Sequence, residues 1–307
     1  MSTITNASME TDLRLAASLD AALHVLLHDA GTIRNTGALT FLGSINGSGS
    51  DTSRIRQAGL DGYDAMVAVA DGAAASTTAL TDASVDIAVA RKCILRQITD
   101  LATMTGMGAG DISPARLAAS VVGEYEKAFM TDVGTAVASF STTVGTSGAD
   151  MTVDDYFDAI FSLELGSVTG PFYCLLAPRQ LADLQESLRA EGGALAFNSS
   201  TNEMLNIKGQ GYAGSFMGVD IFKSSLMTVA GGNVEGGMWG AGCLGYKTGQ
   251  IVQPPGAFMT SPDREVVVEF ARGAGAASGY TQVLGHAYYG IGVLEQARGV
   301  GIVTDAP

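Results

Sequence analysis

The chain has 307 residues with 17 basic and 31 acidic side chains, and its formal net charge is −14. A chain of this length forms one large core or two linked domains. A protein that neutralises phosphates needs clustered Lys and Arg, so the acidic balance argues against tight binding to nucleic acid and to anionic membranes. The hydrophobic fraction of 47% and the charged fraction of 16% are typical of a folded globular protein.

The N-terminal sequence MSTITNASMETDLR has no basic segment followed by an apolar stretch, so we expect no secretory signal and a chain that stays in the cytosol. We also expect no membrane-spanning helix, because no apolar run approaches the roughly 20 residues that such a helix needs. Three cysteines, Cys93, Cys174 and Cys243, lie far apart in or beside apolar segments. This arrangement predicts buried, reduced thiols.

The N-terminal third of the chain predicts little core of its own. A short amphipathic helix is expected from Thr11, because leucines recur at three-to-four spacing up to Leu26. From residue 36 to about 100, short apolar pieces alternate with stretches of Gly, Ser and Asp, and residues 85–98 have the two-residue period of a strand. Together they predict a long hairpin-like excursion that packs on something else.

A long helix is the strongest local prediction. Ser113 is the expected N-cap and Pro114 the first helical residue, and the helix runs to about Phe140. One apolar stripe follows it, formed by Ala118, Val121, Val122, Tyr125, Phe129, Val133, Ala136, Val137 and Phe140. At about 1.5 Å per residue the helix is roughly 40 Å long. We therefore expect a spine on which two regions are mounted.

The C-terminal half predicts an α/β unit followed by strands. Thr152 and Asp155 form a capping box that opens a helix, a core strand follows at 172–177, and Pro178 starts another helix. Further strands are expected, first as short pieces in a glycine-rich region and then as an antiparallel sheet that closes the chain, at 219–222, 251–252, 265–270, 280–294 and 300–303.

One segment matches a nucleotide-binding pattern by its letters alone. Residues 240–245, GAGCLG, fit G-x-G-x-x-G, and Lys247 follows one residue too late for a phosphate loop. Phosphate binding needs a helix after the glycines, whose free N–H groups hold the phosphate. Gly249 and Pro254 downstream are incompatible with a long helix. We therefore expect no nucleotide site here.

Other candidate chemistry is incomplete as well. His24 and His28 are one helical turn apart but have no third metal ligand nearby, and His286 is the only other histidine. Three carboxylates cluster at a helix start, where they bind free N–H groups, namely Asp154, Asp155 and Asp158. Paired acid/base catalysis is the alternative for them. We expect no catalytic, cofactor or metal site, and therefore no enzyme.

The order of these parts resembles a known family, the major capsid proteins of tailed phages that share the HK97 fold. The likeness lies in five segments taken in order, ARLAASVVGEYEKAFMTDV (115–133), DDYFDAIFSLE (154–164), PFYCLLAPRQLADLQESL (171–188), GYAGSFMGVDIFKSS (211–225) and HAYYGIGVLEQARGVGIV (286–303). No single segment is a signature, and their order and spacing carry the resemblance.

The resemblance implies an α+β, HK97-like capsid fold with an N-terminal arm, an extended β-hairpin loop, a long spine helix, and peripheral and axial domains. The implied boundaries are an arm with a short helix at 1–35, the extended loop and a strand into the peripheral domain at 36–100, the spine helix at 101–148, the axial domain at 149–255 and peripheral strands at 256–307. In the family the extended loop lies over a neighbouring subunit.

By the same resemblance the chain is a major capsid protein that assembles into pentamers and hexamers and forms the icosahedral head around phage double-stranded DNA. Its implied partners are copies of itself, a portal protein, separate scaffold and cement proteins where these are used, and packaged DNA through weak contacts, with no membrane. Its implied place is the virion, after assembly in the host bacterial cytoplasm. The alternatives are an encapsulin-like bacterial nanocompartment and a soluble enzyme built around His286 or the glycine segment.

Two features differ from some members of the family. Only about 30 residues precede the extended loop, so a scaffold, if used, is expected to be a separate protein. Some relatives also form Lys–Asn isopeptide links between subunits. None of the lysines matches that motif, so we expect no covalent cross-links through Lys92, Lys127, Lys208, Lys223 or Lys247.

Overall fold

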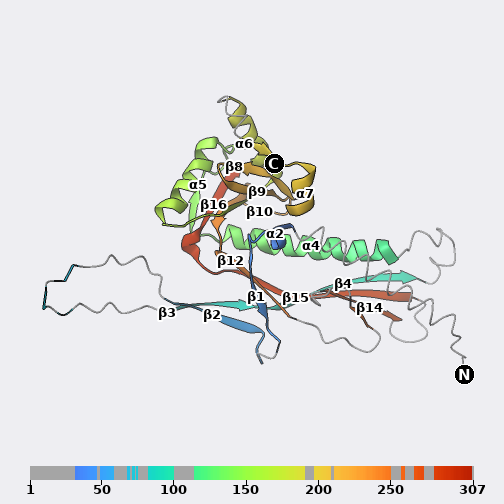
Figure 1. Cartoon of the computed structure of the whole chain (residues 1–307). Coiled ribbons are helices and arrows are strands. Elements are labelled where there is room, and N and C mark those ends of the chain that lie inside the picture. Colours follow the sequence, from blue (N-terminus) through green and yellow to red (C-terminus); the bar gives the residue numbers. More distant parts are fainter. Residues whose placement is uncertain are drawn as a thin grey trace, which may run out of the picture.

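The fold is given by a computed structural model, which describes residues 32–46, 49–58, 68–69, 71–72, 74, 82–99, 114–190, 197–208, 211–249, 257–259, 266–272 and 280–305. A long helix lies between two β-sheets, with the larger sheet above it and the smaller sheet below it in Figure 1.

The larger sheet has eight strands. Their order is β5 (Thr142–Val144), β16 (Gly299–Asp305), β11 (Asn233–Gly240), β6 (Phe172–Leu176), β9 (Val219–Lys223), β8 (Tyr212–Phe216) and β7 (Asn198–Ser199), with β10 (Thr228–Ala230) paired to β11. Successive residues face opposite sides, so in β6 Tyr173 enters one core and Cys174 the other. Helices α5 (Val153–Leu165) and α6 (Pro178–Ala190) cover the side of Cys174.

The smaller sheet has six strands in the order β1 (Thr40–Ser44), β12 (Leu244–Thr248), β15 (Tyr280–Val293), β14 (Val266–Arg272) and β13 (Ala257–Met259), with β4 (Ala90–Thr99) also paired to β15. The long strand β15 organises this sheet. Its residues 280–289 pair with β4, and its residues 289–293 pair with β12. The smaller sheet therefore depends on one strand of 14 residues.

Strands β2 (Thr52–Ala58) and β3 (Asp82–Ala88) form a separate two-stranded ribbon. Its base is anchored, because the Ile87 side chain is buried against Gly290 and Gly292 of β15. In Figure 1 the ribbon lies at one end of the smaller sheet and away from the larger sheet. Most of the ribbon therefore extends beyond the body of the subunit.

Helix α4 (Pro114–Ala138) is the middle layer, and it joins the two sheets. Its buried side chains recur every four residues at Val121, Tyr125, Phe129, Val133 and Val137. The Phe129 ring lies 5.3 Å from the ring of Tyr289 on β15. After the helix, the Phe140 ring lies 6.5 Å from that of Trp239 on β11. One apolar stripe thus packs first on the smaller sheet and then on the larger sheet.

A short segment before the ribbon closes this core. Helix α2 (Thr32–Asn35) places Ile33 in it, and the Trp239 indole N–H donates to the carbonyl of Ala38 at 2.8 Å. Helix α7 (Asn202–Lys208) flanks the larger sheet beside α2. Buried indole and backbone groups are thus hydrogen-bonded to each other, as a stable core requires.

Gln180, on α6, is a fully buried amide that links the helix to β16, to β11 and to the residue that follows β6. Its Nε2 donates to the Thr304 hydroxyl at 2.9 Å and to the carbonyls of Ile302 and Val234 at 3.2 and 3.4 Å. Its Oε1 accepts from the N–H of Ala177 at 3.0 Å. A buried amide with all these partners fixes α6 against β16 and β11, because any shift would leave polar groups unpaired.

The sequence predicted the main helices and several strands. The expected long helix is α4, and Thr152 and Asp155 form the capping box that opens α5. The expected strands at 172–177, 219–222, 265–270 and 280–294 are β6, β9, β14 and β15. The expected helix from Thr11 and the strand piece at 251–252 lie outside the described residues.

Two sequence predictions were wrong. Strand β16, expected at 300–303, does not close an antiparallel sheet with β14 and β15, because it crosses to the larger sheet and pairs with β11. The continuous strand expected over 85–98 is broken at Val89, since β3 pairs with β2 whereas β4 pairs with β15. In both places the hydrogen-bonding partner changes, and the local residue pattern carries no signal for that change.

Strand β11 is a central strand that the sequence did not predict, because it contains three glycines. The packing explains one of them. A Cβ atom at Gly237 would lie 2.5 Å from Cγ1 of Val137, so α4 can approach the sheet this closely only over glycine.

We predict that Gln180→Ala lowers the free energy of unfolding of the isolated subunit by about 2–4 kcal/mol, because it leaves the Thr304 hydroxyl and buried backbone groups without partners. Urea unfolding followed by circular dichroism measures this loss. Gln185→Ala is the matched control, since it makes the same change on the same helix at a half-buried amide. Equal losses for the two variants would refute the role given to Gln180.

Candidate functional surfaces

The glycine pattern at 240–245 is a crossing between the two sheets. Strand β11 ends at Gly240 in the larger sheet and β12 begins at Leu244 in the smaller one, so no helix follows the glycines. The return crossing lies beside it, because the N–H of Leu294 donates to the carbonyl of Cys243 at 2.7 Å. Lys247 points elsewhere and donates to the Ser53 hydroxyl at 2.6 Å. This geometry does not form a phosphate cradle.

His286 lies on β15, on the side of the smaller sheet that faces away from α4. Its neighbours in sequence, Gly285 and Ala287, face the helix instead. The His286 ring is buried, and its Nδ1 lies 2.7 Å from Nη2 of Arg91. Because a guanidinium can only donate, Nδ1 is the acceptor. This hydrogen bond joins β15 to β4 and gives His286 a structural role.

Of the three cysteines, Cys174 and Cys243 are buried, as expected, but Cys93 is exposed. The expectation for Cys93 was wrong because side chains alternate along β4. Ile94 packs on the core, which directs Cys93 to the outer side of the sheet. Burial raises the pKa of the Cys174 thiol, and burial together with the charge of Glu295 raises that of Cys243 to about 12.

Of the three carboxylates near the start of α5, Asp155 forms the helix cap with Thr152. The N–H of Thr152 donates to Oδ2 of Asp155 at 2.9 Å, and the N–H of Asp155 donates back to the Thr152 hydroxyl at 3.2 Å. Asp154 and Asp158 are exposed to solvent. Asp155 therefore caps the helix, as the sequence indicates, and Asp154 lies in its first turn, where a negative charge is favourable, whereas Asp158 lies beyond that turn.

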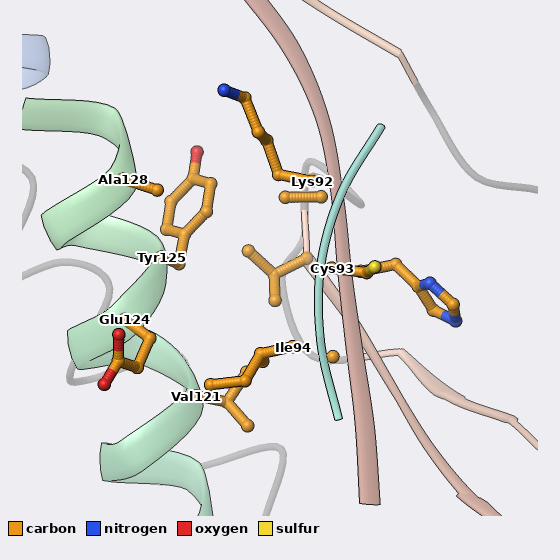
Figure 2. A pocket seen from close by; sticks show the side chains of 11 residues that line it. Lys92, Cys93, Ile94, Val121, Glu124, Tyr125 and Ala128 are labelled. Atoms are coloured by element: carbon orange, nitrogen blue, oxygen red, sulfur yellow. The ribbon is translucent and has the colours of Figure 1, made fainter. Parts of the chain in front are cut away.

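A cavity of about 260 Å³ separates the first half of α4 from the smaller sheet. Figure 2 shows Val121 and Tyr125 of the helix facing Ile94 of β4, whereas Cys93 points to the other side of the strand. Its charged groups are already paired across the layers, since Glu124 binds Arg96 of β4 at 3.3 Å. The cavity is mainly an apolar space between layers, without a set of groups for catalysis.

A second hollow, of about 360 Å³, lies between α4 and the segment that follows β9. Lys127 of α4 and Lys223 of β9 line it, and both side chains are exposed. In the part of the chain that the structure describes, neither lysine has a carboxylate partner, unlike Lys92 with Asp132 and Lys208 with Asp220. Glu126 also lines the hollow but is bound to Arg34, so Lys127 and Lys223 are the charged side chains of the hollow that lack an ion-pair partner among the described residues.

Within the described residues, no group of three or more His, Cys, Asp or Glu side chains is arranged to hold a metal ion. His24 and His28 lie outside these residues. No helix of the described part is long and apolar enough to cross a membrane. What the described surface does offer is large apolar side chains in solvent, among them Phe161, Leu165 and Ile207.

The chain is similar in structure to shell proteins, although no protein-family model and no curated protein sequence matches it. The capsid protein of a native GTA particle is 10% identical, with a TM-score of 0.59 over 90% of this chain and 91% of that one. The capsid protein of cyanophage Pam1 is 14% identical, with a TM-score of 0.57 over 91% and 92%. The SrpI encapsulin of Synechococcus elongatus is 13% identical, with a TM-score of 0.58 over 87% and 84%.

These similarities extend over nearly the whole length of both chains, at identities where only the fold is comparable. The chain therefore has the mixed α/β fold of HK97-like capsid proteins. The fold likeness agrees with the resemblance found in the sequence, which rested on the order of the helices and strands.

We predict that one thiol per unassembled subunit reacts rapidly with Ellman's reagent at pH 8, and that it is Cys93. The other two should react only on unfolding, because burial shields Cys174 and Cys243 and raises their pKa. The measurement is the absorbance time course with and without denaturant. Cys93→Ala is the control and should remove the fast phase. A fast phase of two or three equivalents would contradict the described burial.

Proposed function

We propose that this chain is the repeating subunit of a closed protein shell, and that the shell is the capsid of a tailed phage. The fold of HK97-like capsid proteins supports this proposal. The described candidate groups support it as well, because they form an ion pair, a helix cap and a crossing between sheets. A catalytic site would instead need reactive groups that are free to contact a substrate. We therefore propose a structural protein without a catalytic centre or cofactor.

The observation that carries the proposal is the ribbon of β2 and β3. The two strands pair with each other over seven residues each. No other strand of the described chain pairs with either of them. A two-stranded ribbon is marginally stable by itself in water. One of its faces is apolar, with Ile55 opposite Val85, and the other is charged, with Arg54 bound to Asp86 at 2.9 and 3.0 Å. Such a two-faced ribbon fits against the surface of a second subunit.

Within the shell we assign the parts of the chain as the resemblance implies. These are the N-terminal arm at 1–35, the extended loop at 36–100, the spine helix at 101–148, the axial domain at 149–255 and the peripheral strands at 256–307. The last assignment needs one change, because β16 (Gly299–Asp305) belongs to the sheet of the axial part. The spine helix is then the layer shared by both domains.

We propose that pentamers and hexamers of the subunit form an icosahedral head around double-stranded DNA, assembled in the host bacterial cytoplasm. A portal protein and, where they are used, separate scaffold and cement proteins complete the virion. The net charge of −14 supports weak contact with DNA, because an acidic wall does not trap the polymer as it enters.

An encapsulin-like nanocompartment is the second candidate. The SrpI encapsulin matches this chain as well as the capsid proteins do, with a TM-score of 0.58. The two functions share the shell and differ in its contents, which are a genome in one case and proteins in the other.

We predict that the protein expressed by itself, or with its scaffold, forms closed particles visible by negative-stain electron microscopy. The ratio of absorbance at 260 and 280 nm of particles from an infected host should be that of packed DNA. A protein-like ratio with a discrete cargo protein would instead favour the compartment. A small soluble oligomer at high concentration, with and without scaffold, would contradict both.

We predict that Ile55→Ser with Val85→Ser abolishes particle formation while the subunit stays folded. These two side chains face each other on the apolar side of the ribbon and are only half-buried within the subunit. Arg54→Ser with Asp86→Ser is the matched control, because it makes the same change on the charged side. An exposed ion pair contributes about 1 kcal/mol or less. Particles from the first variant at the yield of the control would refute the docking of the apolar side.

A further inference from the structure

Helix α5 presents an unusual face to solvent. Its buried residues Val153, Tyr156, Ala159 and Leu163 pack on the larger sheet. The opposite side carries three large apolar residues, Phe157, Phe161 and Leu165, of which Phe161 is 62% and Leu165 74% exposed. They lie four residues apart and form one stripe. We call this stripe, with the carboxylates described next, the α5 face.

Carboxylates lie within the same stripe. Asp154, Asp158 and Glu164 are exposed, and the helix contains no Lys or Arg. Positions 154, 158, 161 and 165 follow one another at spacings of three or four, so acidic and apolar groups alternate on one surface. None of these three carboxylates has an ion-pair partner among the described residues. The α5 face is therefore both apolar and negatively charged.

The opposite flank of the larger sheet combines exposed apolar residues with two lysines that lack a carboxylate partner among the described residues. Figure 1 places α7 on the other side of this sheet from α5. On α7, Met204 is 41% and Ile207 71% exposed, and the carboxylate of Glu203, one turn before Ile207, is exposed as well. Gly211, three residues after the end of α7, lines the hollow with Lys127 and Lys223, and its carbonyl accepts the N–H of Lys223 at 2.8 Å. We call Met204, Ile207, Lys127 and Lys223 together the α7 face.

We propose that the α5 face of one subunit docks on the α7 face of the next copy in the shell. Apolar side chains then bury each other, and the carboxylates of α5 reach the unpaired ammonium groups of Lys127 and Lys223. The two faces are different and lie on opposite flanks. Each subunit can therefore contact one neighbour through its α5 face and another neighbour through its α7 face. Repetition of such a contact closes a ring when the rotation between copies permits it. This inference rests on the proposed shell function and names the surface that joins neighbours.

A symmetric contact between two α5 faces fits less well. It would bring three carboxylates of each copy against three of the other with no basic group to balance them. Like charges brought together at an interface disfavour association. The apolar stripe alone would permit either arrangement, so the charges decide between them.

Cysteine cross-linking in assembled particles tests this contact. In a Cys93→Ala background, chains with Leu165→Cys and Ile207→Cys are assembled and treated with a short bismaleimide. The double variant should give a ladder of covalent oligomers on a denaturing gel, because each subunit links to two neighbours. Each single variant should give no dimer. Coassembled single variants should give dimers and nothing larger, because each subunit then carries one cysteine. Only a contact between two different faces produces this result.

The pairing of Ile207→Cys with Val229→Cys is the matched control. Val229 on β10 is 60% exposed but belongs to neither face, so no ladder is expected. A second pair, Phe161→Cys with Met204→Cys, tests the same contact if the first pair disturbs assembly. Dimers from Leu165→Cys alone would overturn the inference in favour of a symmetric contact. Normal particles in which neither pair cross-links would overturn it outright, whereas a wild-type protein that never assembles would refute the shell function itself.

The charges are tested separately in the same particles. Lys127→Glu with Lys223→Glu should lower the yield of the ladder by about tenfold or more, because like charges then face each other. Adding Asp158→Lys to that variant should restore part of the yield. An unchanged yield in the lysine variant would contradict the proposed ion pairs.

Discussion

The packing of α4 is the constraint on which the rest of the subunit depends. A single apolar stripe from Val121 to Phe140 contacts β15 of the smaller sheet with its first half and β11 of the larger sheet with its second half. The chain also crosses between the sheets twice, and the crossings are hydrogen-bonded to each other at Cys243. The helix and the paired crossings together hold two sheets, which share no strand, as one body. Phe129 is the centre of this packing, and its loss by substitution with Ala is of the kind that costs about 3–5 kcal/mol.

A body held in this way leaves its other surfaces available for contact. The ribbon of β2 and β3 extends from one end of the smaller sheet, and the α5 face and α7 face lie on opposite flanks of the larger one. Each of these surfaces exposes apolar groups that the rest of the described chain leaves uncovered, and each would gain burial from a second molecule. In the proposed shell every copy would meet the same neighbouring surfaces, so one sequence would carry both sides of the proposed contact.

The sequence predicted what local patterns encode. The four-residue period of α4, the capping box at Thr152 and the apolar run of β6 each correspond to the structure. It did not predict β11 or the move of β16 to the larger sheet, because both depend on which distant strand lies alongside. Gly237 of β11 is required by the approach of Val137, a contact about 100 residues away in the chain. Among the candidate surfaces, the sequence indicated the ribbon as a hairpin without a core. It did not indicate the exposed stripe of α5. An apolar residue on a helix is expected to face the core, and the sequence alone does not show which side of α5 is buried.

The central claim is that the subunit is complete only among its copies, and hydrogen–deuterium exchange tests it most directly. The measurement compares the backbone amides of residues 52–58 and 82–88 in free subunits and in assembled particles, with β11 as an internal reference. A ribbon that depends on a neighbour opens at low free-energy cost when alone. We expect its amides to exchange rapidly in the free subunit and slowly in the particle, while those of β11 stay slow in both. Slow exchange of the ribbon in the free subunit, or equally rapid exchange in the particle, would contradict the account.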